Sequence, residues 1–195
     1  MIDASTYLEK YKILCKEPFI FCPHNQCVTL EETKESATLR KVVIENLPNK
    51  TIVLDLDKYS NLNTGKSLRS ILESEKGIFK CCDYLIITIV ENRINLIFVE
   101  MKSNLPKPSE VIKQFKGGYA FFAYSHAIVE QFYTDEVIEI SNFVFKYVVV
   151  TNKTSNKRTT KLDKYSNKSY TPANYLTRSV NNNNNSENIY FGRLL

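Results

Sequence analysis

Two neighbouring β-rich runs constrain the fold of this chain more than any other feature. Residues 83–90 and 94–102 are dominated by Ile, Leu, Val and aromatic side chains, and a short Glu-Asn-Arg segment between them can turn the chain. This pattern predicts an antiparallel hairpin. Glu100 and Lys102 are two residues apart and project from one face of a strand, while Asp83 opens the neighbouring run. The hairpin therefore brings these three charged groups together at one edge of a sheet.

Further elements are expected on both sides of the hairpin. Short runs rich in β-formers predict strands at residues 40–45, 51–56, 143–151 and 189–191. Apolar spacing and start signals predict helices within residues 1–16, 66–75 and 110–132. Gly117-Gly118 is the expected weak point of the last helix. On the 66–75 helix, Glu75 shares the apolar face with Leu68, Ile71 and Leu72.

Composition indicates an ordinary globular chain and excludes several classes. The 195 residues are 43% hydrophobic and 24% charged, which is typical of one domain with its own core. We expect an N-terminal extension over about 1–38, a core over about 39–151 and a basic, Asn-rich region over about 152–195. Apolar runs too short to cross a bilayer and the lack of a secretory signal predict a cytoplasmic protein that does not bind membranes. The five cysteines are then expected to be reduced.

Asp83, Glu100 and Lys102 together have a physical use in catalysis. Two carboxylates can share a divalent ion with phosphate oxygens and water, an arrangement that Mg²⁺ accepts and Mn²⁺ can replace. The ion would lower the pKa of a bound water, and the ammonium could orient that water or offset developing negative charge. Solvated residues at a strand edge are the alternative, since a bare Glu-x-Lys pattern is weak by itself. The apolar run before Glu100 favours the site, because buried charges need partners.

The same residues carry a resemblance to a known group. Lys80-Cys81-Cys82-Asp83-Tyr84-Leu85 followed by Val99-Glu100-Met101-Lys102 is similar to the core of the PD-(D/E)XK nuclease superfamily, in particular its small restriction-endonuclease-like members. The likeness spans roughly residues 77–122, and Cys82 stands where the superfamily's name has Pro. The resemblance implies an α/β fold with a restriction-endonuclease-like core, in which helices flank a mixed central β-sheet.

The resemblance also implies an activity and its residues. Asp83, Glu100 and Lys102 would be the catalytic set of a Mg²⁺- or Mn²⁺-dependent phosphodiesterase, with Gln114 assisting from the next helix. Glu75 is the expected upstream metal ligand and Glu73 its alternate. DNA is favoured over RNA as substrate, a homodimer or a partner subunit is expected, and a role in antiviral defence follows by analogy. The alternative is a catalytically inactive nuclease-fold subunit that binds nucleic acid or a partner protein.

Three other sequence patterns bear on function. Cys15, Cys22, His24 and Cys27 are zinc-ligand types, but their irregular spacing favours core and loop roles over a structural zinc site. His126 is expected to have a packing or surface role, and the aromatic residues around it are expected to serve core and interface packing. The polar C-terminal region carries basic residues that predict phosphate contacts, with a solvated loop as the alternative. The candidates there are Lys153, Lys157, Arg158 and Lys161.

Overall fold

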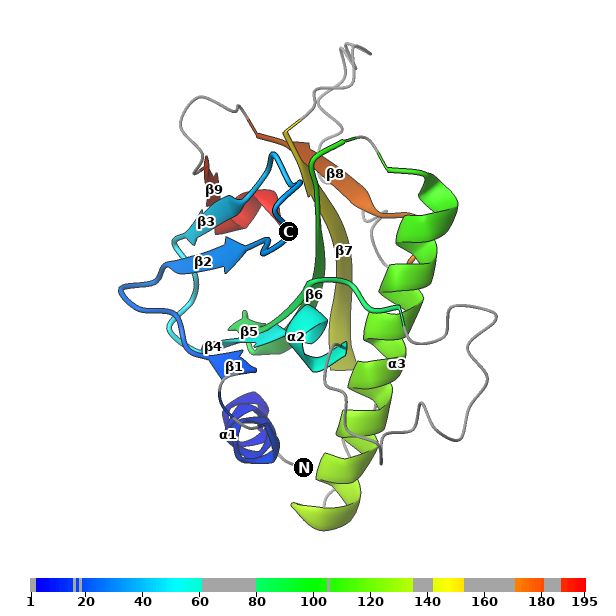
Figure 1. Ribbon diagram of the computed structural model, residues 1–195. Coiled ribbons are helices and arrows are strands. Elements are labelled where there is room, and N and C mark those ends of the chain that lie inside the picture. Colours follow the sequence, from blue (N-terminus) through cyan, green and yellow to red (C-terminus); the bar gives the residue numbers. More distant parts are fainter. Residues whose placement is uncertain are drawn as a thin grey trace.

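The computed structural model defines most of the predicted elements (Figure 1). It describes residues 3–15, 17, 19–60, 80–104, 106–134, 142–152, 171–180 and 187–195. The expected helix at 66–75 with Glu73 and Glu75, the four basic candidates between Lys153 and Lys161, and the Asn-rich run lie outside these described residues.

The larger of two sheets carries the hairpin at its centre. Its strand order is β1-β4-β5-β6-β7-β8, and it mixes antiparallel with parallel pairs, so the predicted mixed α/β sheet is confirmed. The strands are β1 (Ile20–Phe21), β4 (Thr51–Asp55), β5 (Tyr84–Val90), β6 (Arg93–Lys102), β7 (Phe143–Thr151) and β8 (Leu176–Ser179).

The β5–β6 hairpin forms as its sequence predicts. Glu91 and Asn92 have φ values of 49° and 61°, the left-handed conformation that two-residue hairpin turns require. The ladder runs from Val90 opposite Arg93 to Tyr84 opposite Val99. One residue further, the same register places Asp83 opposite Glu100.

Helix α3 (Pro108–Phe132) connects β6 to the parallel strand β7 and covers one face of the large sheet (Figure 1). It is continuous through Gly117-Gly118, so the expected weak point there is wrong. At the two glycines the helix instead approaches its neighbours closely. A Cβ atom on Gly117 would lie 1.8 Å from the Lys80 carbonyl oxygen, and one on Gly118 would lie 2.7 Å from Cys82 Sγ. Small residues therefore seat the helix on the segment that leads to Asp83.

A second, three-stranded sheet lies on the opposite face of the large sheet (Figure 1). It consists of β2 (Val28–Glu31), β3 (Lys41–Glu45) and β9 (Glu187–Tyr190), followed by a short 3-10 helix, Phe191–Arg193. The two strands predicted at 40–45 and 51–56 both form, but β3 joins the small sheet while β4 joins the large one. The last predicted strand ends at Tyr190, because the chain enters the 3-10 helix there.

Alternating side chains of the large sheet build two cores. Leu85, Ile87 and Phe98 pack toward α3 and the N-terminal helix α1 (Ala4–Leu14). Ile86, Ile97 and Val99 pack toward the small sheet. Buried aromatic residues of α1 belong to the first core, so the segment expected as an N-terminal extension contributes to the interior. The protein thus has three layers: helices, large sheet and small sheet.

A short helix after β4 contacts the backbone of Asp83. This helix, α2 (Leu56–Ser60), begins directly after β4, and its first two backbone N–H groups donate to the Asp83 carbonyl oxygen at 2.8 and 3.3 Å. Among the helices in the described part of the chain, none has the length and apolar content needed to span a membrane.

Candidate active site

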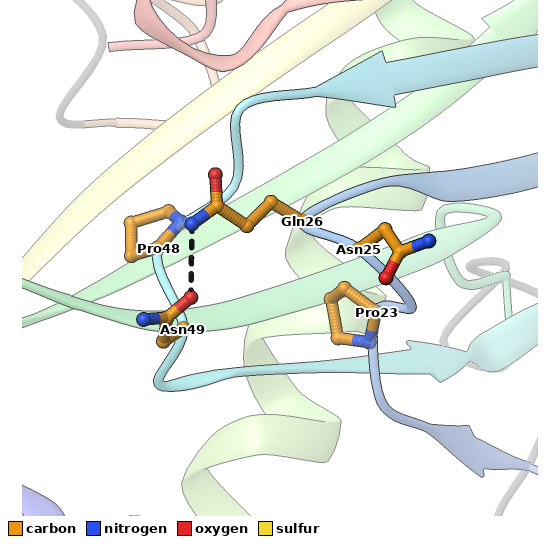
Figure 2. A pocket seen from close by; sticks show the side chains of 5 residues that line it. All are labelled: Pro23, Asn25, Gln26, Pro48 and Asn49. Carbon is orange, nitrogen blue, oxygen red and sulfur yellow. Dashed lines mark hydrogen bonds between the residues drawn. The ribbon is translucent and has the colours of Figure 1, made fainter.

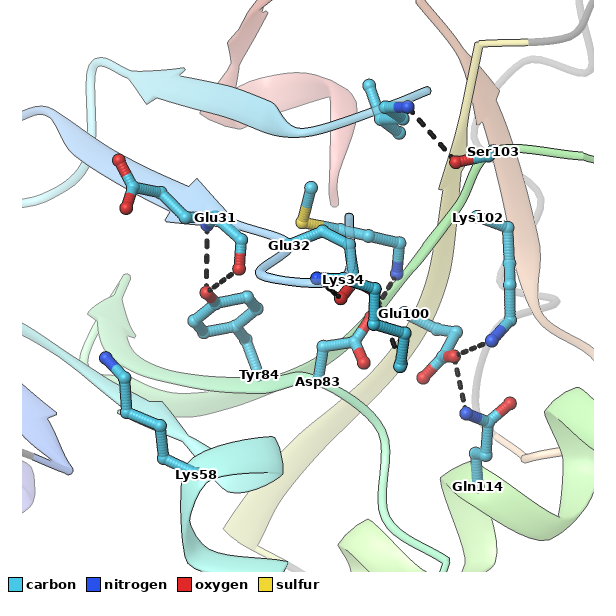
Figure 3. A network of polar contacts seen from close by, with 12 residues as sticks. Glu31, Glu32, Lys34, Lys58, Asp83, Tyr84, Glu100, Lys102, Ser103 and Gln114 are labelled. Atoms are coloured by element: carbon cyan, nitrogen blue, oxygen red, sulfur yellow. Dashed lines mark hydrogen bonds and ion pairs between the residues drawn. The ribbon is translucent and has the colours of Figure 1, made fainter. Parts of the chain in front are cut away.

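The charged residues of the hairpin meet at the end of the large sheet, as predicted. Asp83 immediately precedes β5 and is 8% exposed, and Glu100 on β6 is fully buried. Asp83 Oδ2 accepts a hydrogen bond from the Met101 backbone N–H at 2.6 Å, which fixes its carboxylate beside β6. Figure 3 shows the Asp83 and Glu100 side chains next to one another.

Two of the predicted site residues, Gln114 and Lys102, contact the Glu100 carboxylate. Gln114 Nε2 on α3 donates to Glu100 Oε1 at 2.5 Å, and Lys102 Nζ forms an ion pair with the same oxygen (Figure 3). The four predicted residues Asp83, Glu100, Lys102 and Gln114 are therefore brought together. Glu100 and Lys102 reach α3 because they lie on the same, helix-facing side of β6 as Phe98.

The second oxygen of the Glu100 carboxylate, Oε2, differs from the first in its hydrogen bonding. Glu100 Oε2 is buried and has no hydrogen-bond partner among the described residues. Leaving a buried carboxylate oxygen unpaired costs free energy. One other buried side-chain oxygen shares this condition, Oδ1 of Asn152, which follows β7 at the same end of the sheet. In the described part of the chain, both of these unpaired oxygens lie at the end of the sheet that carries the candidate site.

Burial and mutual repulsion dominate the electrostatics of the carboxylate pair. Desolvation, followed by the neighbouring charge of Glu100, raises the pKa of Asp83 well above its ordinary value. Desolvation also raises the pKa of Glu100, although Lys102 and the hydrogen bond from Gln114 oppose this shift. The Lys102 ammonium offsets only part of the repulsion. A divalent cation between the two groups would relieve the rest.

A small cavity on the open side of Asp83 adds residues that the sequence did not reveal. Its lining includes Glu32, Asp57 and Asp83, from the β2–β3 loop, α2 and the start of β5. Glu32 and Asp57 are far from the hairpin in sequence and follow no motif with it. Sequence reasoning therefore missed them, since Glu32 reaches the site through the packing of the small sheet on the large one, and Asp57 reaches it through the pairing of β4 with β5.

Other groups that attracted interest in the sequence form no comparable site. Within the described ranges, no group of three or more His, Cys, Asp or Glu side chains is arranged to hold a metal ion by itself. Cys22 is exposed and Cys27 is half-buried, on either side of a tight turn that His24 and Cys27 close by backbone hydrogen bonds. Cys15 packs against the first core, where burial raises the pKa of its thiol to about 11. His126 is buried, in agreement with its predicted packing role.

Two larger cavities lack the chemistry of the hairpin site. One of about 380 Å³ lies between two turns and is lined by neutral side chains, with Gln26 Nε2 donating to Asn49 Oδ1 at 3.0 Å (Figure 2). Another of about 290 Å³ lies between α1, β4 and α3 and is mainly apolar. Its polar lining includes Asp55, whose carboxylate is paired with Lys58 at 3.0 Å. Neither cavity combines carboxylates with an unpaired buried oxygen.

Comparisons with protein-family models, with curated proteins and with solved structures gave no significant match to this chain.

Proposed function

We propose that this protein is a metal-dependent nuclease whose site is formed by Asp83, Glu100, Lys102 and Gln114. The observation that carries the proposal is the buried carboxylate pair in which Glu100 Oε2 has no partner among the described residues. A structural carboxylate would be expected to have its oxygens satisfied. An unpaired oxygen beside a second carboxylate of raised pKa instead fits a site that receives a cation.

The donor set suits Mg²⁺ or Mn²⁺. Both ions prefer oxygen ligands, and Mg²⁺ is commonly held by one or two carboxylates while water and phosphate oxygens complete its shell. Asp83 and Glu100 supply two carboxylates, and the nearby Glu32 and Asp57 add negative charge at the cavity. When bound, such an ion supplies a nucleophilic water at neutral pH and stabilises charge on a phosphoryl group.

The chain's own residues would divide the remaining work. Asp83 and Glu100 would hold the cation, with Asp83 fixed by the Met101 N–H. Gln114 keeps Glu100 Oε1 in place from α3, so Oε2 is the oxygen left for the ion. The Lys102 side chain is 28% exposed, so its ammonium lies at the border between Glu100 and solvent, where it could orient a water or contact a phosphate.

Fold and motif support the same proposal. A mixed sheet flanked by helices, with Gln114 on the helix after the Glu-Met-Lys strand, is what the resemblance to the PD-(D/E)XK superfamily predicts. A restriction-endonuclease-like core is accordingly part of the proposal. The substrate class is nucleic acid, with DNA favoured.

The test is cleavage of labelled single- and double-stranded DNA and RNA by the purified protein in Mg²⁺, in Mn²⁺ and in a chelator. We expect metal-dependent cleavage that falls by about 100-fold or more in Lys102→Ala and in Glu100→Ala. Lys12→Ala is the matched control, because Lys12 forms an exposed ion pair with Glu9 on α1 at 2.8 Å. It should cleave at the wild-type rate.

Two results would contradict the proposal. One is the absence of cleavage with either ion on all four substrates, and the other is a Lys102→Ala variant as active as the wild type. Metal-independent binding of nucleic acid without cleavage would instead favour a non-catalytic nuclease-fold subunit.

A further inference from the structure

The loop between β2 and β3, residues 32–40, connects two strands of the small sheet. Hydrogen bonds also hold it to the end of the large sheet where the candidate site lies. The Tyr84 hydroxyl accepts a hydrogen bond from the Glu31 N–H at 2.9 Å and donates to the Glu31 carbonyl at 2.8 Å. Ser103 Oγ accepts from the backbone N–H groups of Thr38 and Leu39 at 2.8 and 3.1 Å. Tyr84 follows Asp83, and Ser103 follows Lys102. The loop is therefore anchored by the immediate neighbours of two site residues.

A third anchor comes from the next strand. Asn152, directly after β7, donates from Nδ2 to Thr38 Oγ1 at 2.9 Å. The end of β5 thus holds the last residue of β2, just before the 32–40 loop, and the ends of β6 and β7 hold the loop itself at Thr38 and Leu39. A loop with this many contacts to the sheet has a defined position over the carboxylate pair.

This loop presents one carboxylate and one ammonium to the site. The Glu32 side chain is 12% exposed and lines the cavity shared with Asp83. Lys34 Nζ lies 3.5 Å from Glu32 Oε2, and the Lys34 backbone N–H donates to Glu32 Oε1 at 3.0 Å. Figure 3 shows Lys34 and Glu32 beside Asp83 and Glu100, on the side opposite Gln114.

The charge on Lys34 is coupled to the site. Partial burial by itself would lower the pKa of Lys34, but the carboxylates of Glu32, Asp57 and Asp83 outweigh it, so the pKa is raised. In the other direction, Lys34 contributes to lowering the pKa of Glu100. The ammonium is therefore within electrostatic reach of both proposed metal ligands.

Among the residues that the structure describes, Lys34, Lys58 and Lys102 lie around the site and are held to different degrees. Lys102 pairs with the fully buried Glu100, and Lys58 pairs with the nearly buried Asp55 at 3.0 Å. Lys34 has a longer ion pair and a side chain that is 64% exposed. An exposed ion pair of this length is worth little free energy, so exchanging its carboxylate for another anion costs little.

We infer that Lys34 is a phosphate-binding residue of the site: its ammonium leaves Glu32 and contacts a phosphate of the nucleic-acid substrate. The inference rests on the proposed nuclease function. It gives the site cations on two sides, Lys102 next to α3 and Lys34 on the anchored loop. A polyanion bound between them would be positioned over Asp83 and Glu100.

The inference has two measurable consequences, one of which does not depend on cleavage. Without nucleic acid, removing the Lys34 charge should tighten Mn²⁺ binding by about threefold or more, because a cation near the two carboxylates competes with the ion. With substrate, kcat/KM of Lys34→Ala should fall by about tenfold, because a phosphate contact is lost. Lys34→Arg keeps the charge and should stay near wild type in both measurements.

The experiment compares Mn²⁺ titrations by calorimetry, and cleavage kinetics at saturating Mn²⁺, for wild type, Lys34→Ala, Lys34→Arg and Lys41→Ala. Lys41 is the matched control, since it pairs with Glu31 on the same small sheet at 3.2 Å. Unchanged Mn²⁺ affinity and unchanged kcat/KM in Lys34→Ala, in a wild type that binds the ion and cleaves, would overturn the inference alone. A wild type that neither binds Mn²⁺ nor cleaves would overturn the proposed function and this inference with it.

Discussion

Two sets of interacting polar side chains lie on the helix side of the large sheet, and their hydrogen bonding differs. One set joins α1 to α3: the Tyr7 hydroxyl bonds His126 Nδ1 at 3.0 Å, and the Tyr11 hydroxyl bonds Ser125 Oγ. His126 Nε2 also lies 3.6 Å from Glu130 Oε1. The other set joins β6 to α3 through Glu100, Lys102 and Gln114, and there Glu100 Oε2 is unpaired.

This difference in hydrogen bonding distinguishes polar groups that stabilise the fold from polar groups that serve the proposed catalysis. Buried polar groups that serve only the fold can satisfy one another, and each satisfied pair adds a modest amount of stability. A carboxylate that must receive an ion keeps an oxygen free and raises the free energy of the ion-free protein. We therefore interpret the α1–α3 set as structural and the hairpin set as functional. Three predictions test that distinction.

The largest expected effect belongs to Asp83→Asn. The amide oxygen of Asn can still accept the hydrogen bond from Met101, while one of two repelling buried charges is removed. We expect cleavage to fall by about 100-fold or more. At neutral pH and without metal, we expect the free energy of unfolding to rise by about 1 kcal/mol.

Cleavage rates and urea unfolding in a chelator measure both changes. Glu9→Gln, at an exposed ion pair on α1, is the control and should alter neither quantity appreciably. A fully active Asp83→Asn variant, or one clearly less stable than the wild type without metal, would place Asp83 in the structural class.

For Tyr7→Phe we expect a smaller effect, in which stability falls and activity is kept. The substitution removes the hydroxyl that bonds His126 Nδ1 and leaves a buried ring nitrogen without that partner. We expect a loss of about 1–2 kcal/mol in the free energy of unfolding, with kcat/KM unchanged. Urea unfolding and cleavage kinetics test this; a large fall in kcat/KM for folded protein would show that the α1–α3 set also serves catalysis.

The smallest expected effect concerns pH. The pKa values of Asp83 and Glu100 are raised in the folded protein, mainly by burial, so the folded state binds their protons more tightly than the unfolded state does. The stability of the metal-free protein should therefore decline as pH rises from the ordinary carboxyl pKa of about 4 through the raised values. Above them the destabilisation from these two groups is complete.

Urea unfolding across this pH range, in a chelator, should show that decline for the wild type and a shallower one for Asp83→Asn. Addition of Mg²⁺ should reduce the decline, because binding to the ionised carboxylates stabilises the folded state. Equal pH slopes for wild type and Asp83→Asn would contradict the assignment of raised pKa values to this pair.

Much of the site was predictable because its residues are local in sequence. A two-residue turn between β-rich runs sets the register, and the register places Asp83 opposite Glu100. Gln114 lies on the next helix, which follows β6 after a short connection. By contrast, no local pattern indicated that β3 and β4, so close in sequence, belong to different sheets.

The sequence by itself determined the hairpin, the long helix after it and the meeting of Asp83, Glu100 and Lys102, since strand alternation and turn geometry are local properties. Only the tertiary structure decided that Glu32 and Lys34 border the site, that Gly117 seats α3 on the Lys80 backbone, and that Glu100 keeps one oxygen unpaired. These features depend on how two sheets and a helix pack around one sheet edge. Contacts of that kind join residues far apart in the chain, and they leave no periodic pattern in the sequence.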